Sequence, residues 1–175
     1  MSAGGFWDFT SNMASKDTAY TDVFLGAHTD NTYFSDPAGL QMFHLLSHTD
    51  GNGGQSLLVD GFNAAKELQM KDPTAYEILS TVPIYSHASG NDGISIQPYI
   101  PFPALVHDPT GKHLIQVRWN PYDRAAIDID MAQMESWYQA ARYGLLVCHR
   151  RGHVCGTFPR TKTPLGPTCG VRQSI

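Results

Sequence analysis

Short runs of apolar or alternating residues, bounded by Gly, Pro, Asn and Asp, predict a chain rich in strands. The predicted strands cover residues 21–27, 39–47, 55–60, 81–86, 94–97, 104–107 and 113–119. Along the last of them, polar and apolar residues alternate from Leu114 to Trp119, which is typical of a half-buried sheet. Between the last two, Asp108-Pro109-Thr110-Gly111 predicts a hairpin turn.

Three segments instead carry helical spacing. Helices are predicted over residues 62–70, 73–80 and 131–142. Asp72 as N-cap and Pro73 in the first turn begin the second helix, which presents Tyr76 and Leu79 on one face. Beyond the third helix, Gly and Pro are too frequent for a clear assignment. The whole pattern predicts a mainly β fold, a barrel or sandwich with inserted helices.

Composition sets the outer limits. The chain has 175 residues, 42% hydrophobic and 16% charged, which suits one domain with a buried core. No apolar run reaches the length of about 20 residues that a membrane span needs. The first residues resemble neither a signal peptide nor a transit peptide, so we expect a cytoplasmic or mitochondrial protein. A net charge of -4 argues against nucleic acid as a partner.

The charge is unevenly distributed along the chain. All 16 acidic residues lie at or before Glu135, whereas 5 of the 12 Lys and Arg residues lie beyond residue 142. All three cysteines also lie in this last segment, and an odd number gives no disulfide framework. We therefore expect a partial catalytic domain over residues 1–142 and an atypical basic tail over 143–175. The tail is either an interaction arm or, as we favour, the product of a shifted reading frame.

One short motif carries candidate chemistry. His28-Thr29-Asp30 places an imidazole and a carboxylate two residues apart, and such residues share a face of an extended strand. Both can then reach one metal ion, as in the two-histidine, one-carboxylate sites that hold Fe(II). Taken alone, the motif is more typical of a surface His–Asp contact at a strand end than of a metal site. The other histidines, such as His44 in an apolar strand, are more typical of core or solvated residues.

Several longer stretches carry a more specific pattern than the His-x-Asp motif: residues 17–21, 26–34, 39–44, 53–62, 117–120, 122–125 and 137–138. Together they resemble the trimethyllysine dioxygenase and γ-butyrobetaine hydroxylase family of TauD-like Fe(II)/2-oxoglutarate oxygenases. The resemblance implies a double-stranded β-helix, or jelly roll, which is incomplete at its C-terminal end. It implies Fe(II) held by His28, Asp30 and a distal histidine, with 2-oxoglutarate and O₂ as co-substrates and ascorbate as a further candidate cofactor. The implied reaction is hydroxylation of Nε-trimethyllysine at C3, in carnitine biosynthesis.

The resemblance also implies residues that bind the substrates. Trp7 and Tyr20 match positions of an aromatic cage for the quaternary ammonium group, and Asp17 is a polar neighbour. Asn120 matches a residue near the substrate carboxylate, and Ser56 one near 2-oxoglutarate. Without the resemblance, the aromatic residues would be ordinary core and rim residues, and Ser56 a strand residue bonded to backbone.

The sequence departs from the family beyond Trp137. The family has a distant His-Gly-Arg segment and a later Arg for 2-oxoglutarate, and none of the residues after Trp137 reads His-Gly-Arg. His149 and Arg160 imitate the spacing, but too few residues precede His149 to supply the missing strands. We therefore expect a fragment of the family's catalytic domain with unpaired sheet edges.

Three hypotheses follow. The first is a trimethyllysine hydroxylase, with γ-butyrobetaine as the alternative substrate. The second is a catalytically inactive fragment or pseudoenzyme. The third is a binding module for small cationic ligands that uses Trp7, Tyr20 and Tyr33. The sequence leaves the oligomeric state open.

Overall fold

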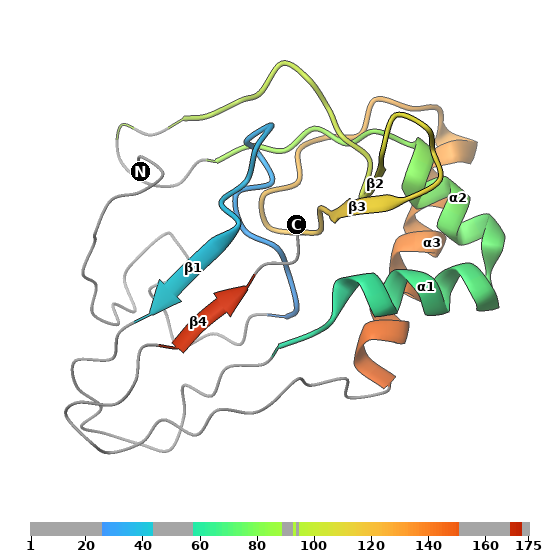
Figure 1. Ribbon diagram of the computed structural model, residues 1–175. Coiled ribbons are helices and arrows are strands. Elements are labelled where there is room, and N and C mark those ends of the chain that lie inside the picture. Colours follow the sequence, from blue (N-terminus) through green and yellow to red (C-terminus); the bar gives the residue numbers. More distant parts are fainter. Residues whose placement is uncertain (1–25, 44–57, 89–92, 94, 151–168, 173–175) are drawn as a thin grey trace, which may run out of the picture.

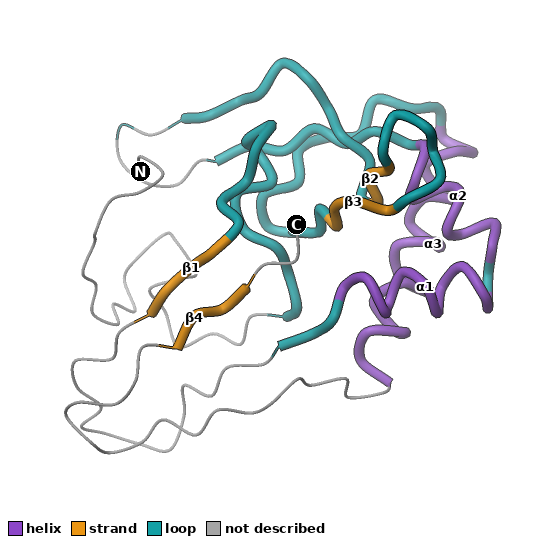
Figure 2. The backbone as a smooth tube through the Cα atoms, in the orientation of Figure 1, coloured by secondary structure: helices purple, strands orange, loops and turns teal. Residues whose placement is uncertain are grey.

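The structure is a computed structural model that describes residues 26–43, 58–88, 93, 95–150 and 169–172 (Figure 1). Three helices pack together at one side, and the β1–β4 pair lies at the other (Figure 1). Loops make up much of the path between them (Figure 2). Residues 55–57 of the predicted strand over 55–60 lie outside the described residues, and of residues 58–60 only Val59 forms a bridge. Most of the predicted strand over 21–27 and His44 also lie outside the described residues.

Two helices begin and end where local capping signals place them. Helix α1 spans Gly61–Lys71, and the Asp60 side chain accepts a hydrogen bond from Asn63 N at 2.9 Å. Helix α2 spans Pro73–Thr81, and Asp72 accepts from Ala75 N at 2.9 Å. These caps satisfy backbone N–H groups that have no partner within the helix. Both predicted helices are confirmed.

Helix α3 spans Met131–Arg150 and runs past the predicted end at residue 142. Glycine normally weakens a helix interior, so no helix was predicted there. Gly144 nevertheless lies against the other two helices: a Cβ added there would be in ordinary contact with Leu79 Cδ1 at 3.5 Å and Leu68 Cδ2 at 3.8 Å. Packing of α3 on α1 and α2 at this point offsets the weak helix propensity of glycine. The proposed boundary at residue 142 therefore falls inside α3.

The predicted hairpin is confirmed as β2 (Leu105–His107) and β3 (Leu114–Val117), paired antiparallel. At the turn, Gly111 N donates to Asp108 O at 2.8 Å, and Gly111 adopts a φ of +69° that favours glycine. The pairing register shifts between Val106 and His107, as in a β-bulge.

The β1 strand (Leu40–Phe43) confirms the described part of the predicted strand over 39–47. It pairs antiparallel with β4 (Cys169–Arg172), so a segment of the basic tail completes this sheet.

The strands predicted over 81–86 and 94–97 are wrong in the described residues. They form only isolated bridges, including Ile84 with Phe102 and Ala88 with Ile96. Pro83 lies within the first of these stretches and Pro98 directly follows the second, and neither has an N–H for a ladder hydrogen bond at its position.

The core lies between the helices and the β2–β3 hairpin. Its buried hydrophobic residues are Ala65, Leu68, Ala75, Leu79, Ala104, Leu105, Ile127, Trp137, Ala140 and Ala141. Within the described residues, the strands form two antiparallel pairs, helices are inserted between strands along the chain, and the helices contain more residues than the strands. The mainly β jelly roll therefore stays a prediction. None of the described helices is both long and apolar enough to span a bilayer.

Candidate metal site

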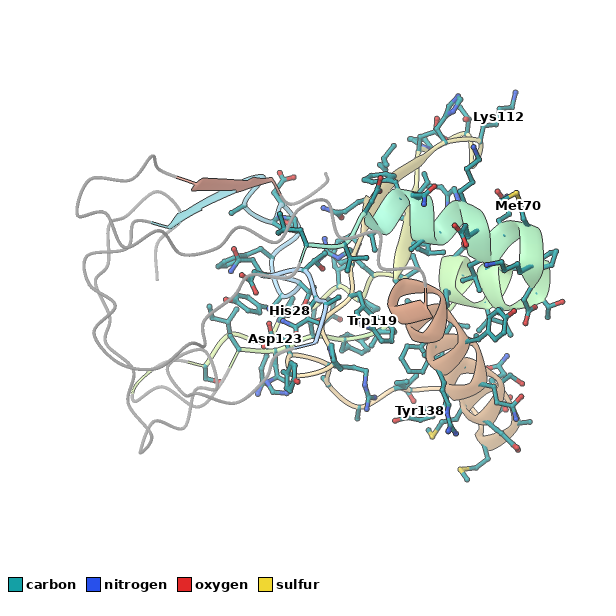
Figure 3. The ribbon with its side chains drawn as sticks, turned by 90° about the horizontal axis from the view of Figure 1, so that it is seen from below. His28, Met70, Lys112, Trp119, Asp123 and Tyr138 are labelled. Carbon is teal, nitrogen blue, oxygen red and sulfur yellow. The ribbon has the colours of Figure 1, made fainter. Side chains whose placement is uncertain are left out.

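The structure brings His28 and Asp30 together. His28 Nε2 lies 3.1 Å from Asp30 Oδ1, and the two side chains are 24% and 33% exposed. The pair lies in the middle of the molecule, near Asp123, and Trp119 lies between it and helix α3 (Figure 3). Partial exposure leaves room for a further ligand on the open side of the pair.

Both ring nitrogens of His28 face oxygen acceptors. His28 Nδ1 lies 2.7 Å from Gly26 O, so this nitrogen donates its proton to the carbonyl. Nε2 then points its lone pair, or a second proton, toward Asp30. The hydrogen bond with Asp30 raises the pKa of His28 above 6.5, against the opposing effect of burial, and the bond to Gly26 and the charge of Asp123 add to the rise. The site therefore favours a cation between the imidazole and the carboxylate.

A metal ion shared by the two side chains is compatible with their separation. Two ligands at right angles around a metal with bonds of about 2.1 Å lie about 3.0 Å apart. The Nε2–Oδ1 distance of 3.1 Å matches that edge. The Gly26 carbonyl fixes the tautomer that leaves Nε2 free for a metal, as backbone carbonyls do around other metal-bound histidines. The residues present thus suit Fe(II).

Thr29, between the two candidate ligands, attaches this segment to the end of the hairpin. Thr29 N donates to Trp119 O at 2.7 Å, and Trp119 N donates to Thr29 Oγ1 at 2.8 Å. The Trp119 ring stacks on Trp137 of helix α3, with ring centroids 6.3 Å apart. The backbone beside the candidate ligands is therefore connected to the core.

A second loop borders His28. Asn120 Nδ2 donates to Asp123 Oδ2 at 2.9 Å, and Asn120 Oδ1 accepts from Tyr122 N at 3.0 Å. The Tyr122 ring meets the His28 ring edge-on, with centroids 6.4 Å apart. Asn120, which the resemblance places near the substrate carboxylate, thus organises the loop that carries Tyr122 and Asp123 beside His28.

Arg118 is the buried cation of this region, with 7% of its surface exposed. Its guanidinium donates to the backbone oxygens of Thr32 and Phe34, both at 2.6 Å, and of Ser35 at 3.3 Å. It also lies over the Phe102 ring, 4.2 Å from the centroid. Burial lowers the pKa of Arg118, with the charge of Asp36 opposing the change. Arg118 thus holds the loop that follows Asp30.

The other predicted site residues, Trp7, Asp17, Tyr20 and Ser56, lie outside the described residues. Over the part of the chain that is described, no third His, Cys, Asp or Glu completes a metal-binding group. Sequence reasoning assigned no role to Thr29, Arg118 or Asp123. No local signal marked Arg118, because it lies on a predicted strand of alternating polar and apolar residues, where an arginine is typical of the solvent-facing side.

Comparison with known proteins identifies the family. The sequence model of the family described as "Taurine catabolism dioxygenase TauD, TfdA family" matches residues 2–143. The chain is 49% identical over 125 residues to a trimethyllysine dioxygenase of Meyerozyma guilliermondii, which covers 71% of this chain and 31% of the relative. It is 43% identical over 141 residues to the human mitochondrial trimethyllysine dioxygenase. The aligned part is 79% of this chain and 33% of that relative.

A more distant relative is the human gamma-butyrobetaine dioxygenase, 27% identical over 140 residues, or 79% of this chain and 36% of the relative. The chain spans about a third of the length of these curated relatives. The family match includes His28, Asp30 and the whole hydrogen-bonded network around them. The chain belongs to the TauD, TfdA dioxygenase family.

Proposed function

We propose that this chain carries the iron-binding part of an Fe(II)- and 2-oxoglutarate-dependent hydroxylase that acts on Nε-trimethyllysine at C3. One observation carries the proposal: His28 Nε2 and Asp30 Oδ1 converge at 3.1 Å, with the other ring nitrogen held by Gly26 O. Membership of a dioxygenase family supports the same chemistry. We place this reaction in carnitine biosynthesis, as the resemblance to the family implies.

The residues of this chain would bind and orient the reactants. His28 Nε2 and Asp30 Oδ1 would hold the metal, and the Gly26 carbonyl would keep the imidazole in the required tautomer. The nearby charge of Asp123 would favour a cation at this position. Iron and 2-oxoglutarate, when bound, supply the oxidising power that inserts an oxygen atom from O₂ into a C–H bond, with release of succinate and CO₂.

Similarity favours trimethyllysine over γ-butyrobetaine as the substrate. Identity to the two trimethyllysine dioxygenases is 49% and 43%, against 27% to the gamma-butyrobetaine dioxygenase. For the substrate we propose Trp7 and Tyr20 as cage aromatics, with Asp17 beside them and Asn120 near the carboxylate. For 2-oxoglutarate we propose Ser56. Aromatic faces suit a quaternary ammonium group because it has no hydrogen to donate.

We extend the proposal to architecture and location. The antiparallel pairings support a jelly roll, and the end of the family match at residue 143 supports a catalytic part over residues 1–142. A mitochondrial location is supported by the name of the human relative.

The test is succinate release by the 175-residue chain with Fe(II), 2-oxoglutarate, O₂ and ascorbate. We expect Nε-trimethyllysine to stimulate release more than γ-butyrobetaine does, and His28→Ala to abolish the stimulated release. Mass spectrometry of the product should show one added oxygen at C3. Equal stimulation by the two compounds would contradict the assigned substrate.

A specific observation favours a second candidate, a metal-binding chain without turnover. In the described ranges only two donors converge, and a third ligand is absent. Two ligands in place of three hold Fe(II) weakly and leave its orientation less defined. This candidate predicts metal binding that depends on His28, with no substrate-stimulated release of succinate.

A further inference from the structure

We propose that Thr29 and Arg118 are positioning residues that set the geometry of the His28–Asp30 pair. Thr29 precedes Asp30, and Arg118 holds the loop that begins two residues after Asp30. The carboxylate is thereby fixed from both sides by the same short segment, residues 118–119. This inference rests on the proposed metal site and adds two residues that touch neither metal nor substrate.

The Thr29 attachment is reciprocal. Its backbone N–H donates to Trp119 O at 2.7 Å, while its hydroxyl accepts from Trp119 N–H at 2.8 Å. The Thr29 hydroxyl points toward the Trp119 backbone, because it also donates to Trp119 O at 3.4 Å. Without the hydroxyl, the Trp119 N–H would lose its acceptor, and of these bonds only the one from Thr29 N to Trp119 O would remain.

Burial of Arg118 costs more free energy than burial of an apolar side chain at the same position would. Burying a guanidinium costs free energy unless several acceptors surround it. Its three backbone acceptors, from Thr32, Phe34 and Ser35, all belong to one loop, and its remaining side-chain partner is the Gln116 amide oxygen at 2.9 Å. The planar group suits this divergent set of acceptors, whereas a lysine ammonium cannot reach all of them and stack on Phe102 as well.

Both attachments lead to the core of the molecule. The Trp119 ring stacks on Trp137, which is 1% exposed and lies on helix α3. A displacement of residues 28–30 therefore disturbs packed side chains. This attachment limits the freedom of the two donors, which lie 3.1 Å apart, and so reduces the ordering cost of metal binding.

The test is Co(II) binding, followed by its visible absorption, in metal-substituted protein. Loss of groups that orient metal ligands typically weakens affinity about 10- to 100-fold. We expect Thr29→Val and Arg118→Lys each to weaken Co(II) binding by about tenfold, while Thr29→Ser, which keeps the hydroxyl, stays within about threefold of wild type. Matched controls are Thr81→Val and Arg142→Lys, both at exposed helical positions, which should leave the affinity unchanged.

A second readout needs no metal. Amide hydrogen exchange over residues 29–35 of the metal-free protein should accelerate in Thr29→Val and Arg118→Lys, while exchange in helix α2 stays unchanged. This local effect separates positioning from general destabilisation. If Arg118→Lys does not fold, the Thr29→Val and Thr29→Ser pair carries the test.

The outcomes separate this inference from the proposed function. Folded Thr29→Val and Arg118→Lys proteins that bind Co(II) like wild type would overturn the positioning role and leave the metal site intact. Wild-type Co(II) binding that is unaffected by His28→Ala would overturn both.

Discussion

The helical half of the molecule and the candidate metal site are stabilised in different ways. Helices α1, α2 and α3 share buried side chains such as Leu68, Leu79 and Trp137, so many contacts contribute to their packing. The metal site is fixed by a few polar bonds, chiefly those of Thr29 and Arg118. The free energy of unfolding should therefore depend mainly on packing in the helical half. The geometry of the metal site should depend on single hydrogen bonds.

The largest effect on stability is expected for Trp137→Ala. Trp137 is the largest fully buried side chain among the described residues, and it stacks on Trp119. Its removal should lower the free energy of unfolding by about 3–5 kcal/mol. Urea unfolding measures the change, with Met131→Ala on the exposed start of α3 as the control. Equal effects of the two substitutions would contradict the assigned core.

Leu79→Ala separates stability from site geometry. Leu79 is 4% exposed and faces α3 at Gly144, so its truncation should cost about 2–5 kcal/mol. Because it lies in the helical half, the Co(II) affinity of the folded fraction should stay at the wild-type value. Thermal unfolding and Co(II) titration measure the two quantities. A large loss of affinity would show that the two regions are not independent.

Asp72→Ala should have a smaller effect. Asp72 caps helix α2 through Ala75 N, and its own N–H donates to Leu68 O at the end of α1. Losing the side-chain cap should cost about 1 kcal/mol, and Asp72→Asn should restore most of it. The exposed Asp128→Ala is the control in the same urea experiment. No difference between Asp72→Ala and Asp72→Asn would argue against the cap.

The smallest expected effect is the change with pH of the free energy of unfolding. The hydrogen bond with Asp30 raises the pKa of His28 in the folded protein above 6.5. A raised histidine pKa stabilises the metal-free fold below the unfolded value of 6.5, and this stabilisation fades as pH rises through the folded pKa. The stability advantage of wild type over Asp30→Asn should therefore be larger below pH 6.5 than above it. Urea unfolding across that range tests the sign, and a constant difference would contradict the pairing.

Local signals made part of the structure predictable. The Asp72-Pro73 start of α2 and the Asp108–Gly111 turn are encoded within a few residues, and both are confirmed. The proximity of His28 and Asp30 was predicted from the two-residue spacing and is observed, although residues 28–30 form no strand and Asp30 lies in a bend.

Long-range bonds were not predictable in this way. Thr29 and Trp119 are 90 residues apart in sequence, and nothing in either local pattern indicates their pairing. The pairing of β1 with β4 is likewise absent from the local patterns. The pattern over 81–86 predicted a strand where the structure has only isolated bridges, because a hydrophobic pattern reports burial and not hydrogen-bonding capacity, and Pro83 has no N–H to donate. Helix α3 continues beyond residue 142, where Gly144 packs against Leu79 and Leu68, and this packing offsets the low local propensity.

The most direct test of the account is where a metal ion binds. Mn(II) added to isotope-labelled protein broadens the NMR signals of nearby residues. We expect the earliest broadening at residues 26–31 and at residues 119–123, and we expect either His28→Ala or Asp30→Asn to remove it. Broadening centred elsewhere, or unchanged in both variants, would contradict a shared metal site at His28 and Asp30.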